Sequence, residues 1–178
     1  YLDTDERRRF AQVSHEYLIE QVQYQSLSSS QSFDLNFNHP VKEVIWTGAH
    51  TSTKTSQVRA VTAIGGKWQL KLNGHDRMAQ RPLFYFTRQQ VFDYHSGCGG
   101  LDSQVASTTN SADTGFTRLN DTIAVYSFAL RPEEHQPSGT CNFSRIDNAQ
   151  LMTDGAAAAH EVYAVNYNVL HIMSGMGG

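Results

Sequence analysis

The segment "VYAVNYNVLHI" (residues 162–172) alternates large apolar residues with small or amide residues at a period of two. Successive side chains of an extended strand point to opposite faces, so Tyr163, Val165 and Tyr167 share one face. The face that carries the larger apolar side chains is predicted to be the buried one. The segment is therefore predicted to be a half-buried strand of an antiparallel sheet.

Two further segments show the same alternation, "FDLNF" (33–37) and "KWQLKL" (67–72). In each, aromatic or leucine side chains occupy every second position and polar or charged side chains lie between them. This pattern is typical of a strand with one face on a core and one in water. The predicted core consists of Phe33, Leu35, Phe37, Trp68, Leu70, Leu72, Tyr163, Val165 and Tyr167.

The whole chain gives an all-β prediction: an eight-stranded antiparallel jelly-roll β-sandwich with long loops at one end. The segment 83–88 is the least regular of the strands and could instead contain a helical turn around Arg88 to Phe92. No amphipathic helix of ordinary length is expected. The predicted strands lie near residues 14–24, 32–38, 41–47, 66–72, 83–88, 121–130, 141–152 and 161–173.

The chain has 178 residues, which is enough for one domain with a substantial core. Residues 1–13 are interpreted as a lead-in segment and residues 14–178 as a single jelly-roll domain. The first residue is not Met, so we expect the chain to be part of a longer protein.

The predicted connections divide into two chemical kinds. The long connections 48–65 and 96–120 are rich in Ser, Thr, Gly or Ala, and the strand order places them at one end of the sandwich. The connection 131–139 lies at the other end and concentrates charged residues, histidine and proline. A sandwich with variable loops at one end and defined turns at the other is more typical of a structural building block than of an enzyme.

The sequence contains little that indicates catalysis or a cofactor. The histidines are scattered singly with no His-x-His pair, which argues against a cupin-like metal site. Cys98 and His95 are close in sequence, but no signature of a nucleophile surrounds them. The adjacent acids Glu133 and Glu134 are interpreted as solvated or salt-bridged, because a glycosidase needs two acids on facing elements. We therefore expect no enzymatic activity, no metal and no cofactor.

The charge distribution also limits the partners. The formal net charge is −3, so no general basic field attracts nucleic acid, and no direct contact with nucleic acid is expected. The one basic cluster, Arg7 to Arg9, is interpreted as a solvated face or a local contact.

Four stretches carry a family resemblance: "FNHPVKEVIW" (37–46), "LNGHDR" (72–77), "YSFALRPEEHQPSGTCNFSRID" (126–147) and "YAVNYNVLHIMSGMGG" (163–178). They closely resemble the major capsid protein of the nucleocytoplasmic large DNA viruses, specifically the second, C-terminal jelly roll of its double-jelly-roll chain. The resemblance runs over nearly the whole sequence in the same order. The third stretch is its most specific part.

The resemblance implies a structural protein of an icosahedral virion, assembled in the host cytoplasm. Three chains, each with two jelly rolls, would form a pseudo-hexagonal capsomer. The implied partners are other capsid copies, the first jelly roll, minor capsid proteins and, by proximity, an internal membrane. Residues expected at interfaces or in a rigid turn are Arg131, Pro132, Glu133, Glu134, His135, Pro137 and Arg145.

One alternative from another class stays open. A lectin-like jelly roll would use the loops 48–65 and 96–120 to bind a glycan or a receptor. Glycan binding that maps to the second loop would favour this alternative.

Overall fold

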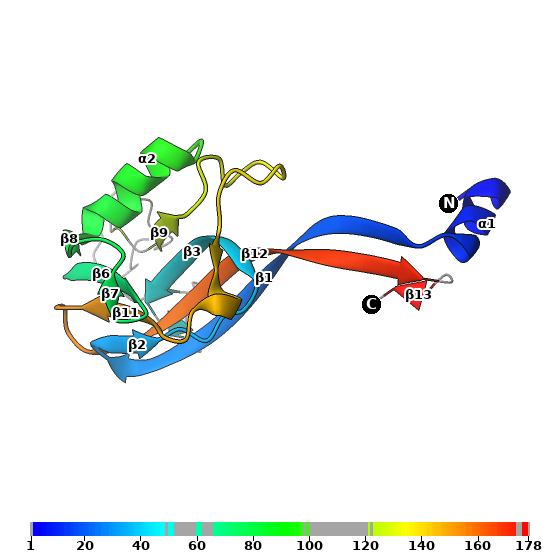
Figure 1. The fold of residues 1–178 in the computed structure, drawn as a ribbon. Helices are drawn as coiled ribbons and strands as arrows, with labels where there is room; N and C mark the ends of the chain where they lie inside the picture. Colours follow the sequence, from blue (N-terminus) through cyan, green and yellow to red (C-terminus); the bar gives the residue numbers. More distant parts are fainter. Residues whose placement is uncertain are drawn as a thin grey trace.

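The computed structural model describes residues 2–48, 50–51, 60–61, 66–97, 99, 121, 123–173 and 176–177. Two antiparallel sheets form a sandwich in this part of the chain (Figure 1), which confirms the predicted fold class. The predicted long loops 48–65 and 96–120 lie largely outside the described residues.

The larger sheet has six strands, and the long antiparallel pair β1 and β12 forms one side of it. The order is β1-β12-β3-β10, with β9 also paired to β3 and β13 to β12. The strands are β1 (His15–Ser30), β3 (Pro40–Gly48), β9 (Ile123–Ser127), β10 (Cys141–Asn142), β12 (Ala158–Met173) and β13 (Met176–Gly177).

The smaller sheet has five strands in the order β2-β11-β6-β7, with β8 also paired to β6. Its strands are β2 (Ser32–Asp34), β6 (Lys67–Leu72), β7 (His75–Asp76), β8 (Arg81–Pro82) and β11 (Ala149–Thr153). A separate two-stranded sheet joins β4 (His50–Thr51) to β5 (Ala60–Val61).

Aromatic rings fill the space between the two large sheets. The ring centroids of Trp46 on β3 and Trp68 on β6 lie 5.6 Å apart, and Phe86 lies 5.1 Å from Trp46. All three side chains are fully buried. Five of the predicted core residues belong to the same buried cluster, and Leu72 packs against it while partly exposed; the five are Phe33, Leu35, Phe37, Trp68 and Leu70.

The predicted core face of β12 is wrong for Tyr163 and Val165, which are only partly buried. The strand instead points Val162 and Ala164 into the core, where both are fully buried. The alternation was correctly placed, but both faces of this strand carry apolar residues, so residue size did not identify the inner face. Tyr167 is buried, but on the outer face that it shares with Val165, where Lys42 and His135 contact its ring, and not in the predicted core.

Helices replace two predicted features. The segment predicted as a strand at 83–88 forms a π-helical turn, η1 (Tyr85–Gln89), that continues into α2 (Gln90–Tyr94). Its buried side chains Phe86, Thr87 and Gln90 lie on one helical face, which accounts for the failure of the period-two interpretation. The third helix is α1 (Thr4–Gln12), in the segment interpreted as a lead-in.

Helix α1 begins with a capping box that was visible in the sequence. The Asp3 side chain caps the first turn, and the backbone N–H of Asp3 donates to Glu6 Oε2 at 3.1 Å. None of its side chains is buried, so it lacks the apolar stripe by which helices are usually identified.

The predicted strand 141–152 is divided. It contains β10, a short 3₁₀ turn η2 (Phe143–Arg145) and β11. The Asn142 side chain accepts a hydrogen bond from the backbone N–H of Ser144 at 3.1 Å and so starts the turn. Strand β12 begins at residue 158, earlier than the expected 161.

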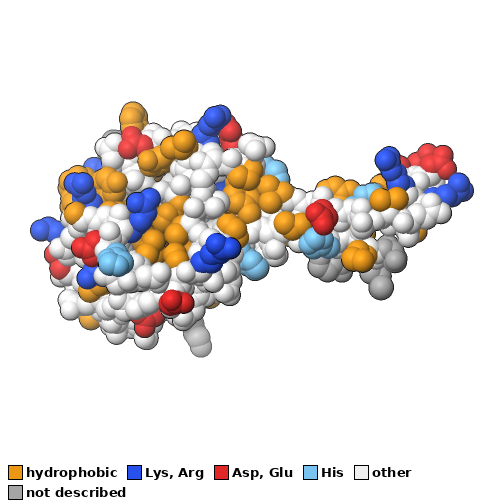
Figure 2. All heavy atoms as spheres, viewed as in Figure 1, with side chains coloured by type: hydrophobic (Ala, Val, Ile, Leu, Met, Phe, Trp, Pro, Cys, Tyr) orange, Lys and Arg blue, Asp and Glu red, His pale blue; other side chains and the backbone are white. Residues whose placement is uncertain are grey.

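The two longest strands, β1 and β12, extend beyond the sandwich as a two-stranded arm (Figure 1). Helix α1 and strand β13 lie at the tip of this arm, far from the body. The charged side chains of both signs gather at that tip (Figure 2). The arm thus carries the described N-terminal and C-terminal residues of the chain.

Candidate functional site

The charged connection of the sequence forms a compact loop, residues 128–139, here called the connector. It leaves β9 and returns to β10 beside β3. Phe128 and Ala129 both donate their backbone N–H to the carbonyl oxygen of Lys42, at 2.9 and 3.2 Å. These bonds attach the start of the connector to β3.

The two ends of the connector also bind each other. The backbone N–H of Arg131 donates to Ser138 Oγ at 2.9 Å, and Pro132 is fully buried. Gly139 has a φ of 144°, and a Cβ atom there would lie 2.7 Å from the carbonyl oxygen of Phe128. A side chain at this position would therefore force the closed loop apart.

A bulge in β3 turns two charged side chains toward the connector. Glu43 is paired with Val165 and Val41 with Asn166, so Lys42 is an extra residue in β3. A bulge of this kind re-aims the side chains beside it. As a result Lys42 and Glu43 are both buried beneath the connector rather than on opposite faces.

The buried Lys42 ammonium has two partners, and one of them also binds the connector. Its Nζ lies 2.8 Å from Glu20 Oε1 on β1 and 5.5 Å from the centroid of the Tyr167 ring. His135 of the connector approaches the same Glu20 oxygen at 3.3 Å through Nδ1. A buried charge is costly unless it is paired, so this group joins the connector to β1 and β12.

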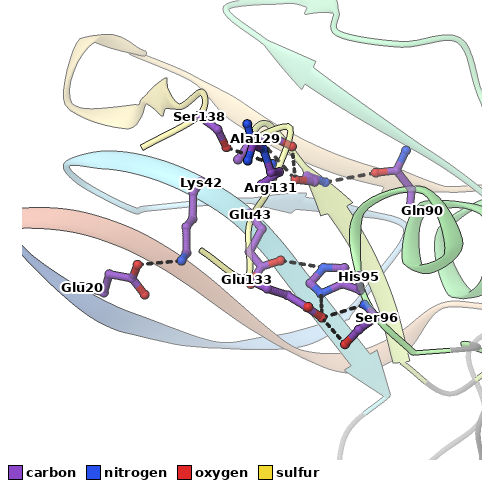
Figure 3. A network of polar contacts seen from close by, with 11 residues as sticks. Glu20, Lys42, Glu43, Gln90, His95, Ser96, Ala129, Arg131, Glu133 and Ser138 are labelled. Carbon is purple, nitrogen blue, oxygen red and sulfur yellow. Dashed lines mark hydrogen bonds and ion pairs between the residues drawn. The ribbon is translucent and has the colours of Figure 1, made fainter. Parts of the chain in front are cut away.

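Glu43 begins a second chain of contacts (Figure 3). His95, at the end of α2, lies between two carboxylates: its Nε2 is 2.9 Å from Glu43 Oε2, and its Nδ1 is 3.4 Å from Glu133 Oε1. Glu133 Oε1 also accepts hydrogen bonds from the backbone N–H and the hydroxyl of Ser96, at 2.8 and 3.0 Å. The connector is thus attached to the end of α2.

The two carboxylates that flank His95 have pKa values shifted in opposite directions. Burial raises the pKa of Glu43 above its ordinary value, an effect that neighbouring His95 and Lys42 oppose. The pKa of Glu133 is lowered, chiefly because the Ser96 N–H donates to the charged form. Glu133 is therefore fixed as an anion at neutral pH.

A third contact ties α2 to β9. The side-chain oxygen of Gln90 accepts a hydrogen bond from the backbone N–H of Ser127 at 3.1 Å, and the Ser127 hydroxyl donates to the Ala129 carbonyl at 2.7 Å. Both residues are buried. The start of the connector is consequently bound to both α2, through Gln90 and Ser127, and β3, through the Lys42 carbonyl.

The structure places the predicted interface residues in three settings. Glu133 and His135 are bound within the chain, as described above. Arg131 and Glu134 form an exposed pair at 3.3 Å, and Pro137 is exposed beside them. Arg145 is exposed on η2, outside the connector.

Sequence reasoning missed the partners of the connector. Glu20, Lys42, Glu43 and Gln90 were not singled out, and His95 was considered only as a neighbour of Cys98, which lies outside the described residues. The adjacent charges Lys42 and Glu43, inside the otherwise apolar "PVKEVIW", were the available signal. Two neighbouring charges in a core strand require partners on both faces or a bulge.

The described residues hold neither a metal-binding group nor a membrane-spanning helix. Within them, no group of three or more His, Cys, Asp or Glu side chains could hold a metal ion. No helix in the described ranges is both long and apolar enough to cross a membrane. The network can hold loops in place, and its geometry supports a positioning role.

The family model that matches this chain and the two relatives described next all represent viral major capsid proteins. Residues 6–99 and 119–178 match the family described as large eukaryotic DNA virus major capsid protein. The chain is 49% identical over 184 residues to the major capsid protein of Pyramimonas orientalis virus, covering 100% of this chain and 46% of that protein. It is 35% identical over 243 residues to the major capsid protein of Paramecium bursaria Chlorella virus 1, covering 51% of it.

Solved structures agree with the sequence matches. The crystal structure of PBCV-1 VP54, fitted into a reconstruction of the virophage Sputnik, matches with a TM-score of 0.71 and 33% identity. The match covers 100% of this chain and 54% of that one. A quasi-atomic model of the PBCV-1 virus capsid matches with a TM-score of 0.69. The chain therefore spans about half the length of the relatives it matches, and its sandwich is a jelly roll of their kind.

Proposed function

Because this chain belongs to the family of large eukaryotic DNA virus major capsid proteins, we propose that it is a structural component of a viral shell. In this proposal residues 14–178 are one jelly roll of a double-jelly-roll chain, and three chains form a pseudo-hexagonal capsomer. The observation that carries the proposal is the family match on both sides of the 96–120 loop. The shell would be icosahedral and assembled in the host cytoplasm.

The connector is proposed to present a rigid contact surface to neighbouring subunits. Glu133 and His135 contact the end of α2 and β1, so the neighbouring pair Arg131 and Glu134 is held in place on the surface. An exposed pair adds little to the stability of its own fold. Arg131 and Glu134 are therefore free to exchange their mutual contact for one across an interface.

The experiment compares two charge changes in the capsid chain. The substitution Glu134→Lys is expected to leave the unfolding temperature almost unchanged and to reduce capsomer formation, because it reverses the exposed charge. Its matched partner Glu133→Gln is expected to loosen the connector while keeping the surface charge of Glu134. Sedimentation measures capsomer formation, and thermal unfolding measures the fold.

Two outcomes separate the parts of the proposal. If the unaltered protein does not form trimers or larger assemblies, the capsid function is wrong. If it does, and the doubly reversed Glu133→Lys and Glu134→Lys protein still forms normal capsomers and shells, the connector is not a contact surface. Minor capsid proteins and an internal membrane are additional partners that the family resemblance implies.

A further inference from the structure

One edge of the smaller sheet is formed by an extended segment, residues 32–38, here called the edge segment. It contains β2, the first strand in the order β2-β11-β6-β7, and it lies beside β1 (Figure 1). Phe33, Leu35 and Phe37 are buried, whereas the residues between them are exposed. The backbone N–H of Leu35 donates to the Ala149 carbonyl oxygen at 2.8 Å. The odd-numbered residues of the edge segment therefore face β11 with their backbone groups.

The even-numbered residues direct their backbone groups to the other side, away from β11. In an antiparallel pair, residues that bond across the ladder alternate with residues that do not. At the edge of a sheet the second kind presents a row of donors and acceptors on which a further strand can pair. In the edge segment these residues are Ser32, Asp34, Asn36 and Asn38.

Two glutamine side chains of β1 bind this row. The Gln25 amide donates through Nε2 to the Asp34 carbonyl oxygen at 2.8 Å. Its Oε1 accepts from the backbone N–H of Asn36 at 2.9 Å. The Gln23 amide binds Asn38 alone, donating to its carbonyl oxygen at 2.6 Å and accepting from its backbone N–H at 3.0 Å. Each glutamine thus satisfies one backbone donor and one backbone acceptor of the edge segment.

The start of the edge segment is closed by the residue two positions before it. Ser30 Oγ donates to the Ser32 carbonyl oxygen at 2.8 Å and accepts from the Ser32 backbone N–H at 3.1 Å. Side chains therefore bind the edge from residue 32 to residue 38.

Strand β1 supplies side chains because its backbone is already paired with β12. In that ladder Gln23 is opposite Ala164 and Gln25 is opposite Val162. Opposed residues share a face, and Val162 and Ala164 are buried on the inner face of the larger sheet. Both glutamines therefore point toward the smaller sheet. A primary amide has a carbonyl acceptor and an N–H donor, as a peptide group has, so it can take the place of a strand.

A buried asparagine on β12 fixes one of the two glutamines. Gln23 Nε2 also donates to Asn166 Oδ1 at 3.1 Å. Asn166 is fully buried, and its Nδ2 donates to the Tyr167 carbonyl oxygen at 3.2 Å. Ordering a long side chain costs conformational entropy, which these additional bonds help to offset. The Gln23 amide is therefore held in position from both sheets.

We propose that the edge segment is a strand-acceptor site that Gln23 and Gln25 keep closed. The ligand that fits such an edge is an extended polypeptide, which binds by adding a strand to the sheet through its backbone. With both amides in place, the donors and acceptors that an entering strand needs are occupied. The chain is thereby prevented from extending its smaller sheet onto other molecules. This inference does not depend on the shell function, because it concerns the single chain.

Peptide binding to the purified protein tests the closed edge. A fluorescent peptide with the sequence of residues 32–38 serves as the entering strand, and its anisotropy reports binding. The double variant Gln23→Ala with Gln25→Ala is expected to bind it about tenfold more tightly than the unaltered protein, or better, a difference of about 1.4 kcal/mol. Gln21→Ala is the matched control, because Gln21 lies on β1 but accepts a hydrogen bond from Asn168. Thermal unfolding verifies that each variant folds.

A second peptide separates strand pairing from non-specific adhesion. A peptide of the same sequence whose backbone amides are all N-methylated lacks the donors for pairing and is expected to bind neither protein. The proposal is overturned if the double variant binds the unmodified peptide no better than the unaltered protein does. It is also overturned if the double variant binds both peptides equally.

Hydrogen exchange decides the question even where the double variant does not fold. In the unaltered protein the amide protons of Asn36 and Asn38 are expected to be protected, although both residues are exposed. Gln25→Ala should accelerate exchange at Asn36 alone, and Gln23→Ala at Asn38 alone, each by about fivefold or more. Unprotected amides in the unaltered protein, or variants that do not distinguish the two amides, contradict the closed edge.

Discussion

Both faces of the six-stranded sheet carry apolar side chains, but the two faces differ in what covers them. On the inner face, Trp46, Val162 and Ala164 are fully buried against the smaller sheet. On the outer face, Leu18, Val22 and Tyr24 of β1 remain exposed, while Val125 of β9 is buried. The comparison teaches that alternation reveals an apolar face without revealing what covers it, because cover comes from segments distant in sequence.

The largest expected effect concerns the inner face. Trp46→Ala is expected to lower the free energy of unfolding by about 3–5 kcal/mol, because the indole packs on Trp68 and Phe86 and its removal leaves a cavity. Tyr24→Ala on the outer face is the counterpart and should cost about 1 kcal/mol or less. Denaturant unfolding of the purified chain measures both. Equal losses would mean that Tyr24 is packed in solution.

Particular residues show where the sequence was sufficient. Phe33, Leu35 and Phe37 were placed in the core from their spacing alone, because only one face of "FDLNF" is apolar. Tyr163 and Val165 were misplaced because β12 is apolar on both faces. Spacing determines which residues share a face, and the three-dimensional fold determines which face is covered.

The candidate site was less predictable than the core. The connector was recognised from its prolines and charges, but its partners on β1, β3 and α2 are between 37 and 115 residues away in the sequence, a separation that no local pattern spans. The bulge at Lys42 depends on pairing with β12, so it is invisible in β3 itself. The alternative of a helical turn around Arg88 to Phe92 is confirmed by η1 and α2, but its start was obscured by the aromatic residues of "LFYF", which are typical of strands.

A smaller effect is expected where the connector contacts the outer face, at Glu20. Glu20→Gln leaves the Lys42 ammonium without its carboxylate at 2.8 Å, and should lower the free energy of unfolding by about 3 kcal/mol. This is the low end for a buried pair, because Glu20 is partly hydrated and Glu43 is also near Lys42. The double variant Glu20→Gln with Lys42→Met should recover most of the loss. A double-mutant cycle by denaturant unfolding measures the coupling, and additive losses would contradict it.

The smallest effect is a pH dependence on the inner face, at His160. Its ring is buried edge-on against Trp68 and Phe33, with centroids 5.1 Å from each, and Nδ1 lies 2.8 Å from the Ala158 carbonyl oxygen. Burial lowers the pKa of His160, so the folded state favours the neutral ring. The unfolded chain then binds a proton more readily than the folded one, and the stability present above about pH 6.5 is lost as pH falls toward the folded pKa.

The substitution His160→Asn isolates this titration, because its side-chain amide can still donate to the Ala158 carbonyl. The variant is expected to flatten the fall in stability between about pH 7 and pH 5, where one proton contributes a slope of at most about 1.4 kcal/mol per pH unit. His75→Gln is the control, since His75 is exposed on β7. Denaturant midpoints across this range measure the effect. An unchanged slope in His160→Asn would assign the acid sensitivity to another group. It would also contradict the claim that the inner face is closed to water at β12.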